Sequence, residues 1–355
     1  MKKSTVVLVG AGGYGASYLS EITDPEVPTE LVGIVDVFPE NIKNMPDGVM
    51  CYPSLEAFYA EHKADIVVVS SPLHYHFDNT KVALENGSYV LCEKPLCATL
   101  EQANDLVRLS EKYNKLIMVG YQLCLNEKIT EAKKDILNGK FGKPISAKTK
   151  TIWKREPAYY NRCDWAGKIQ VHGLPVNDNV VSNATSHYLH NMLFLLGDKP
   201  DSATEVSDIK AKLFKARDIE TFDTAFLSLK AKSKDSIVDV YMYASHAASD
   251  QYPVNFEIHF EKGVLFLGDD DILRFEGAGF SHIYGEINVN NVKTKIKAVI
   301  EYVQSNIPPV CHAKTTIPHM TVVDFLAKQE VTRVPDGFHF DEIINKLYDK
   351  MELEE

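Results

Sequence analysis

A glycine-rich segment near the start of the chain is typical of a turn that binds phosphate groups. Gly10, Gly12 and Gly15 satisfy the pattern G-x-G-x-x-G within residues 10–15. Such glycines allow a tight turn, close approach of backbone N–H groups to a pyrophosphate, and close packing of the following helix. The positive end of that helix favours a bound anion. The segment therefore predicts a dinucleotide site, and an ordinary strand–turn–helix corner is the alternative.

Asp36 lies about 20 residues after Gly15, the usual spacing for an acid that binds a ribose. A carboxylate at this place accepts hydrogen bonds from the adenosine ribose hydroxyls and repels a 2′-phosphate. Residues 36–39 contain no lysine or arginine. The charge pattern therefore favours NAD over NADP, with a surface aspartate as the alternative.

Lys94 could supply an ammonium group to a reaction. It lies in the run Glu93-Lys94-Pro95, directly after an apolar run at 89–92. An ammonium group can donate a hydrogen bond to a reacting oxygen and stabilise negative charge there. From the pattern alone, a surface lysine before a proline that starts a helix is equally compatible.

Asn183 and His187 are four residues apart in a predicted helix, so their side chains should share one face. An imidazole there can accept a proton. A structural histidine is one alternative, and a metal site is another. The pairs His187 with His190 and His74 with His76 have ligand-like spacing, but neither has an obvious third ligand at zinc-like spacing. The sequence therefore predicts no metal.

The first third of the chain should alternate strands and helices. Short apolar runs, typical of buried strands, occupy residues 5–9, 31–35, 66–69, 89–92 and 116–119. Between them, Ser54 and Thr99 are predicted to begin helices, and Asn86-Gly87 to end one. This alternation with short connections predicts a parallel sheet covered by helices on both faces.

Beyond about residue 123 the pattern changes. Residues 254–261 alternate apolar and polar side chains, and Gly263 separates them from an apolar run at 264–267, which predicts a hairpin. Further strands are expected at 224–232 and 236–245, and helices at 292–304 and 341–351. We therefore predict two domains: residues 1–122 and an α+β domain, residues 123–355.

The glycine turn, residues 70–76 and Glu93-Lys94-Pro95 together closely resemble the glucose–fructose oxidoreductase/inositol dehydrogenase/rhizopine catabolism (Gfo/Idh/MocA) family. The resemblance implies an α/β fold: a Rossmann domain followed by an α+β domain built on an open, mainly antiparallel sheet. It also implies an NAD-dependent oxidoreductase. Such an enzyme transfers a hydride between the nicotinamide and a secondary alcohol of a sugar, cyclitol or sugar derivative.

The resemblance assigns roles to residues of both domains. Lys94 would lie beside the nicotinamide and the substrate hydroxyl, and His187 would take the hydroxyl proton, with the reverse assignment also open. The expected cofactor contacts are Gly10, Gly12, Gly13, Tyr14, Gly15, Asp36, Ser70, Ser71, Pro72, His76, Glu93, Lys94 and Gln122. The expected substrate contacts are Arg162, Trp165, Asp178, Asn183 and His187, with residues 220–223 and His246 as further candidates.

Asn183 departs from the family pattern, which has an aspartate at this position. An amide cannot stabilise an imidazolium as a carboxylate would, so we interpret Asn183 as a substrate hydrogen-bonder. Asp178 could supply the absent carboxylate. Arg162 offers a planar fork of donors and Trp165 an apolar face, which suit a polyol, although domain packing would explain both equally well.

Composition limits the possible partners and compartment. Among 355 residues, 38 Lys and Arg stand against 49 Asp and Glu, for a formal charge of −11, and no basic block predicts binding to nucleic acid or a membrane surface. Six cysteines without a C-x-x-C pair indicate reduced thiols in the cytoplasm. The start Met1-Lys2-Lys3 resembles a secretion signal, but its apolar core is short and lacks a cleavage site. The open sheet predicts a homodimer or homotetramer.

Three other functions remain open from the sequence. One is a glycosidase in which the same NAD chemistry transiently oxidises the sugar. Another is a catalytically silent NAD-binding regulator, which the Asn183 departure favours and the presence of Lys94 and His187 opposes. The last is a dehydrogenase that uses NADP, against the charge argument at Asp36.

Overall fold

The computed structural model describes residues 3–287 and 292–354, so Met1 and Lys2 of the basic start lie outside the described residues. Contacts divide the chain into two units. The first contains residues 3–125 and 292–314, and the second contains residues 126–287 and 315–354. The predicted boundary after residue 122 lies close to the first crossing of the chain. The return of residues 292–314 to the first unit was not predicted, because no local pattern signals it.

Six parallel strands form the sheet of the first unit, in the order β3-β2-β1-β4-β5-β6. This is the strand order of the dinucleotide-binding doubly wound fold, and it confirms the predicted parallel sheet. The strands are β1 (Ser4–Val9), β2 (Thr29–Val35), β3 (Cys51–Tyr52), β4 (Ile66–Val69), β5 (Tyr89–Cys92) and β6 (Ile117–Val119).

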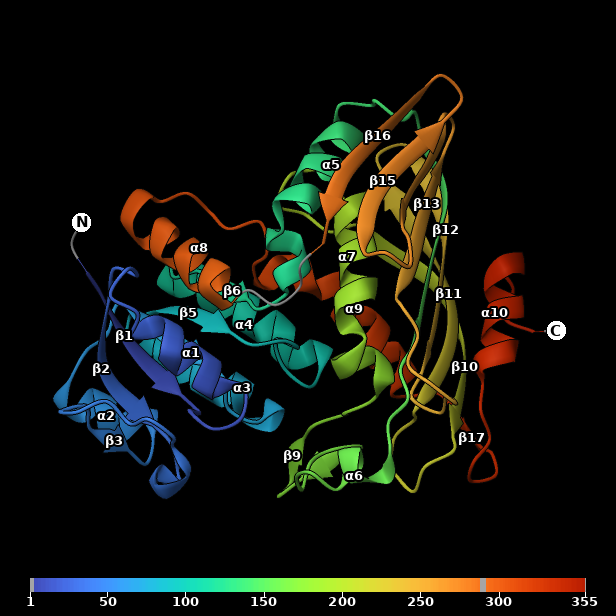
Figure 1. Ribbon diagram of the computed structural model, residues 1–355. Coiled ribbons are helices and arrows are strands. Elements are labelled where there is room, and N and C mark those ends of the chain that lie inside the picture. Colours follow the sequence, from blue (N-terminus) through green and yellow to red (C-terminus); the bar gives the residue numbers. More distant parts are fainter. Residues whose placement is uncertain (1–2, 288–291, 355) are drawn as a thin grey trace. The chain divides into compact units, whose positions relative to one another are not determined.

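Helices cover both faces of this sheet (Figure 1). They are α1 (Gly15–Ile22), α2 (Leu55–Glu61), α3 (His76–Glu85), α4 (Leu100–Tyr113) and α8 (Val292–Ser305), with the short 3-10 turns η1 (Pro39–Asn41), η2 (Leu73–Tyr75) and η3 (Gln122–Leu125). The predicted caps are confirmed, since the Ser54 side chain accepts from the amide of Ala57 and the Thr99 side chain from the amide of Gln102. Gly87, with φ 83°, follows the end of α3 as predicted.

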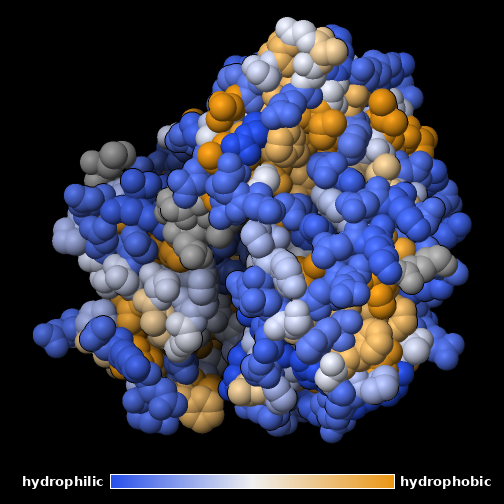
Figure 2. All heavy atoms as spheres, turned by 45° about the vertical axis from the view of Figure 1, so that its right-hand side comes forward, coloured by the Kyte–Doolittle hydropathy of each residue, from blue (hydrophilic) through white to orange (hydrophobic). Residues whose placement is uncertain are grey.

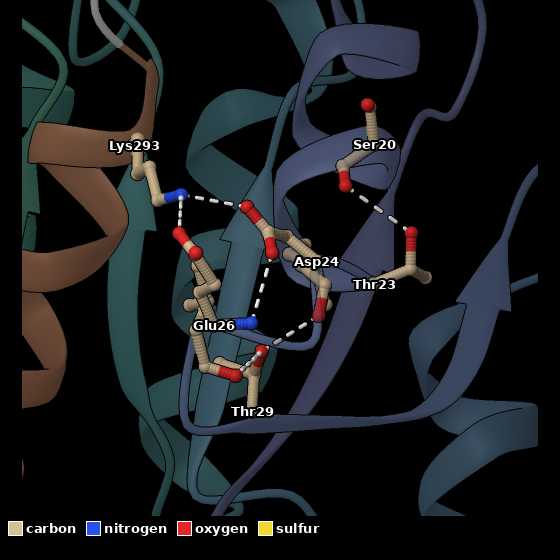
Figure 3. A network of polar contacts seen from close by, with 8 residues as sticks. Ser20, Thr23, Asp24, Glu26, Thr29 and Lys293 are labelled. Carbon is tan, nitrogen blue, oxygen red and sulfur yellow. Dashed lines mark hydrogen bonds and ion pairs between the residues drawn. The ribbon is translucent and has the colours of Figure 1, made fainter.

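Helix α8 packs beside α1, although it comes from the far end of the chain. Ile296, Val299 and Ile300 enter the apolar core that α1 and the sheet share. At the start of α8, the Lys293 ammonium lies 2.6 Å from Asp24 and 3.3 Å from Glu26, in the loop after α1 (Figure 3). Residues near 300 therefore complete the first unit.

The second unit contains a nine-stranded open sheet in the order β16-β15-β14-β13-β7-β12-β11-β10-β17. Neighbouring strands are antiparallel except in the pairs β12–β7 and β10–β17, which confirms an open, mainly antiparallel sheet. The strands are β7 (Pro144–Ile152), β10 (Glu205–Lys215), β11 (Thr224–Ser233), β12 (Ser236–Ser245), β13 (Asn255–Phe260), β14 (Gly263–Leu267), β15 (Ile272–Gly277), β16 (Phe280–Glu286) and β17 (Val331–Arg333).

Two helices lie on opposite faces of this sheet (Figure 1). Helix α7 (Ser186–Leu196) contacts β7, β11 and β13. Helix α10 (Asp341–Lys350) packs on β7 and β12 through Ile344, Leu347 and the preceding Phe340. The remaining elements are α5 (Glu127–Leu137), α6 (Pro157–Tyr160), β8 (Gln170–Val171), β9 (Leu174–Pro175), the π-helical turn η4 (Val180–Ala184) and α9 (Ala313–Leu326).

The surface is mostly polar. On the face shown in Figure 2, hydrophilic side chains predominate and hydrophobic ones form smaller patches between them. In the part of the chain that the structure describes, no helix has the length and apolar character needed to cross a membrane.

Candidate active site

The predicted cofactor residues of the first unit follow the carboxyl ends of its parallel strands. Gly10 follows β1, Asp36 follows β2, Ser70 follows β4 and Glu93 follows β5, and Gln122 begins η3 shortly after β6. Parallel strands end at the same edge of a sheet, where open α/β folds bind their ligands. The structure therefore brings these candidates to one edge.

The glycines of the turn serve different structural purposes. Gly10 has φ +80°, and a Cβ there would lie 2.7 Å from the Ser71 amide nitrogen. At Gly15 a Cβ would lie 1.9 Å from the Gly10 carbonyl oxygen, so only glycine allows α1 to approach the turn. At Gly12 a Cβ would meet no atom within 4 Å. The open space at Gly12 is where a pyrophosphate would approach the backbone.

Asp36 is fixed against the glycine turn. Its Oδ2 accepts a hydrogen bond from the Ala11 amide at 2.9 Å, and its Oδ1 accepts one from the Phe38 amide at 3.0 Å. A carboxylate has about four acceptor sites, so both oxygens retain capacity for the hydroxyls of a ribose.

Glu93 lies in a buried ion pair that the sequence did not reveal. The Tyr18 hydroxyl donates to Glu93 Oε1 at 2.5 Å, and the ammonium of Lys295, from α8, donates to the same oxygen. Glu93 Oε2 accepts from the Lys94 amide at 3.2 Å. Burial by itself raises the pKa of Glu93, but the charge and hydrogen bond of Lys295 outweigh it and lower the pKa below its usual value. Glu93 thus stays ionised and supports the segment that carries Lys94.

His76 connects two segments of the predicted cofactor site. One ring nitrogen lies 2.9 Å from the Ser71 carbonyl oxygen, and the other lies 2.8 Å from that of Pro95. Burial lowers the pKa of His76. Because both nitrogens face carbonyl oxygens, this ring has no nitrogen left for the metal pair with His74 that the spacing suggested.

In the second unit, Asp178 and Asn183 form a hydrogen-bonded pair. The Asn183 amide nitrogen donates to Asp178 Oδ1 at 2.7 Å, and the Gly167 amide donates to Asp178 Oδ2 at 2.7 Å. Asp178 therefore places a carboxylate beside the amide that stands where the family usually has an acid. With its nitrogen toward Asp178, Asn183 presents its carbonyl oxygen in a different direction.

Asn183 and His187 do not lie on one regular helix, and this corrects the sequence prediction. Asn183 belongs to η4, and α7 begins only at Ser186. The amide and the hydroxyl of Thr185 both donate to the Val180 carbonyl oxygen, at 3.1 and 2.6 Å, which widens the turn. His187 is half-buried, whereas all other residues of α7 are buried. Such π-helical turns are frequent at functional sites.

The remaining candidates form the surroundings of Asp178. The Arg162 guanidinium lies 3.8 Å from the centre of the Tyr159 ring and 5.2 Å from that of Trp165. The Thr221 hydroxyl donates to the Asp178 carbonyl oxygen at 2.5 Å. Asp223 is buried and accepts from the Ala216 amide at 2.9 Å. Thr221 and Asp223 thus fix the loops around the site.

Comparison with known proteins identifies the first unit. Residues 4–121 match the Gfo/Idh/MocA family, described as an oxidoreductase family with an NAD-binding Rossmann fold. Residues 4–121 therefore form an NAD-binding Rossmann domain of the Gfo/Idh/MocA oxidoreductase family. The predicted family, fold and NAD cofactor are confirmed.

The names of the curated relatives describe different activities. The chain is 27% identical over 147 residues to 2,7-anhydro-N-acetylneuraminate hydratase from Mediterraneibacter gnavus. This match covers 41% of the chain but only 38% of that relative. An inositol 2-dehydrogenase/D-chiro-inositol 3-dehydrogenase from Lacticaseibacillus casei is 23% identical over 318 residues, 86% of each chain.

Solved structures agree with the whole fold. The WlbA dehydrogenase from Bordetella pertussis, in complex with NADH and UDP-GlcNAcA, superposes with a TM-score of 0.76. The match covers 92% of this chain and 97% of that one at 21% sequence identity, so it supports the fold alone.

Proposed function

We propose that this Gfo/Idh/MocA-family chain is an NAD-dependent dehydrogenase. In this proposal it transfers a hydride between the nicotinamide and a secondary alcohol of a sugar, cyclitol or sugar derivative. The observation that carries the proposal is the shared sheet edge, because the glycine turn and the segment that carries Lys94 both follow carboxyl ends of parallel strands. The inositol dehydrogenase among its relatives supports it.

The first unit fits a dinucleotide. The open space at Gly12 suits a pyrophosphate, and the Asp36 carboxylate suits ribose hydroxyls without a 2′-phosphate. In the proposal, Gly10, Gly12, Gly13, Tyr14, Gly15, Asp36, Ser70, Ser71, Pro72, His76, Glu93, Lys94 and Gln122 form the cofactor site. When bound there, NAD supplies the acceptor or donor of the hydride.

The chain's own residues handle the proton and the charge. Lys94 donates a hydrogen bond to the reacting oxygen and stabilises negative charge on it. His187 takes the hydroxyl proton, while Asn183, oriented by Asp178, accepts a hydrogen bond from the substrate. Arg162 and Trp165 hold the rest of the sugar. Glu93 and His76 keep the Lys94 segment in place.

A second candidate function is supported by the relative named as a hydratase. There, the hydride would leave the sugar and return to it, so that a bond is cleaved with no net reduction of NAD. Sugar release without a lasting absorbance change would identify this redox-assisted glycosidase. A silent NAD-binding regulator would bind cofactor and change no sugar.

The experiment is a nicotinamide absorbance screen over cyclitols, aldoses, amino sugars, uronic acids and glycosides. We expect at least one class to reduce NAD, and Lys94→Ala to lower the rate about 100-fold or more, the scale of a lost acid–base group. Lys112→Ala, an exposed lysine of α4, is the control and should keep full turnover. Full turnover by Lys94→Ala would refute the assignment.

We also propose a cytoplasmic homodimer or homotetramer. All six cysteines are free thiols, as expected in a reducing compartment. The sheet face beside α10 is less apolar than the sequence implied, because Lys230 and Asp239 form an ion pair there at 2.5 Å. Light scattering would give the oligomeric state, and a monomer would refute this proposal.

A further inference from the structure

Three arginines surround one buried histidine at an edge of the nine-stranded sheet. Arg155 follows β7, Arg217 follows β10 and His246 follows β12. These three strands run in the same direction and end on the same side of the sheet, where β7 is next to β12 and β11 lies between β12 and β10. Arg162 follows α6 (labelled in Figure 1), and Tyr160, the last residue of that helix, lies with its hydroxyl 2.7 Å from His246 Nδ1. We call Arg155, Arg162 and Arg217 the arginine cluster.

Aromatic rings hold the arginine cluster together. The guanidinium groups of Arg155 and Arg162 lie 5.1 and 3.8 Å from the centre of the Tyr159 ring. Tyr159 meets the His246 ring edge-on at 5.4 Å between centres, and the Arg217 side chain donates to the Arg155 carbonyl oxygen at 3.4 Å. Burial lowers the pKa of His246, and the three arginines lower it further, to about 3, so this histidine is neutral.

No arginine of the cluster forms an ion pair with an acid in the part of the chain that the structure describes. Among the described residues, no carboxylate oxygen lies within 4.0 Å of a guanidinium nitrogen of the three arginines. By contrast, Arg108, Arg274 and Arg333 each form an ion pair with an aspartate. The charge of Arg217 acts on two acids, Glu156 and Asp223, without an ion pair to either, and Asp223 accepts from the Arg217 backbone amide at 2.8 Å. Asp178 accepts from the Gly167 amide and from Asn183.

Two buried N–H groups at the cluster lack an acceptor within the described residues. His246 is 2% exposed, and its Nδ1 lies 2.7 Å from the Tyr160 hydroxyl. Burial raises the pKa of Tyr160, so this hydroxyl stays protonated and donates to Nδ1, which leaves the ring proton on Nε2. His246 Nε2 and Arg155 Nε are both buried without a hydrogen-bond partner. Buried polar groups normally have partners, so these two donors indicate a missing acceptor.

The cluster adjoins the proposed substrate residues. Tyr159, which contacts two of its arginines, is within electrostatic range of Asp178. We propose that Arg155, Arg162 and Arg217 bind an anionic group, a carboxylate or a phosphate, that the sugar substrate carries. This inference rests on the proposed function and narrows its substrate class to acidic sugars. Planar guanidinium groups bind both anions through paired hydrogen bonds, and a neutral polyol would leave their charge uncompensated.

Isothermal titration calorimetry tests this inference without needing turnover. Glucuronate, glucose 6-phosphate and glucose are titrated into the NAD-loaded protein, its Arg162→Gln and Arg217→Gln variants, and Arg274→Gln as the control. We expect at least one acidic probe to bind about tenfold or more tightly than glucose, because charge-assisted hydrogen bonds are involved. Both cluster variants should lose most of that preference, and Arg274→Gln should keep it.

The probes separate the two anions, and either preference supports the inference. Tighter glucuronate binding identifies a carboxylate, and tighter glucose 6-phosphate binding identifies a phosphate. Equal binding of all three probes by the unaltered protein, or an acid preference that survives in both cluster variants, would overturn the inference. Failure of every sugar in the absorbance screen would refute the proposed activity but would leave this binding result unchanged. Circular dichroism of Arg162→Gln, a change at an exposed residue, is the control for folding.

Discussion

The Asp178–Asn183 hydrogen bond explains how this chain can differ from the usual family pattern. Position 183 holds an amide where the family usually has an acid, but a carboxylate lies next to it. The Asn183 amide nitrogen donates to Asp178 Oδ1 at 2.7 Å. The amide therefore has a fixed orientation, which a carboxylate at position 183 could not share. Two carboxylates at this distance cannot both stay ionised at little cost.

Restoring the family's aspartate should therefore harm this protein. In Asn183→Asp, one carboxyl of the pair must bind a proton and its pKa must rise. Turnover should then fall about tenfold at neutral pH and recover as the pH is lowered. The double variant Asp178→Asn/Asn183→Asp again has a single carboxylate in the pair, so its pH–rate profile should be flatter than that of Asn183→Asp. A pH–rate profile of Asn183→Asp that superimposes on that of the unaltered protein would contradict this reading.

At the scale of elements, helix α8 contributes a buried charge to the segment that carries Lys94. Lys295 has no exposed side-chain surface, pairs with Glu93 and lies 3.2 Å from the Tyr14 hydroxyl in the glycine turn. The ammonium thus joins the glycine turn, β5 and α8. Removing one partner of a buried ion pair leaves an uncompensated charge in the core.

Lys295→Met should destabilise the first unit by about 3–5 kcal/mol, the usual cost of an unpaired buried charge. It should also weaken NAD binding, and the double variant Glu93→Gln/Lys295→Met should recover part of both losses. The matched control is Lys293→Met, two residues away on α8, and the loss of its partly exposed ion pair should cost about 1 kcal/mol or less. Denaturant unfolding measures the stabilities. Equal losses for the two lysine variants would contradict the argument.

The pair also predicts a pH dependence of stability. The pKa of Glu93 is lower in the folded protein than in the unfolded chain. The stabilisation of the folded protein by Glu93 is therefore complete above the pKa that Glu93 has in the unfolded chain. It is lost as the pH falls through the pKa that Glu93 has in the folded protein. Glu93→Gln should unfold with a shallower dependence on acid than the unaltered protein. A steeper acid dependence in this variant would show that Glu93 does not stabilise the fold in its ionised form.

At the scale of the whole molecule, the sequence could predict the structural features that depend on residues close to one another along the chain. The glycine turn, the parallel strands and the capped helices follow from local patterns, so they agree with the structure. Lys295 carries no local signal, because 202 residues separate it from Glu93 and its helix has an ordinary amphipathic pattern. The π-helical turn at Asn183 was missed for a similar reason, since it depends on how Thr185 bonds with Val180.

Cofactor binding should show which segments of the chain belong to the first unit. A ligand that binds only the folded state stabilises the unit that holds it, by about 2.7 kcal/mol at a hundredfold excess over its Kd. Hydrogen exchange with saturating NAD should therefore slow in residues 3–125 and in α8, and change little in strands β10–β15. Protection that spares α8 would contradict its membership of the NAD-binding unit.

The proposed function requires that Lys94 and His187 act on the same substrate hydroxyl. A double-mutant cycle in kcat/KM with Lys94→Ala, His187→Ala and both together tests it most directly, with NAD binding measured for each variant. Groups that act as a unit have non-additive effects, so the double variant should be scarcely slower than the slower single variant. Losses that simply multiply, with NAD still bound, would show that the two residues do not share a reaction.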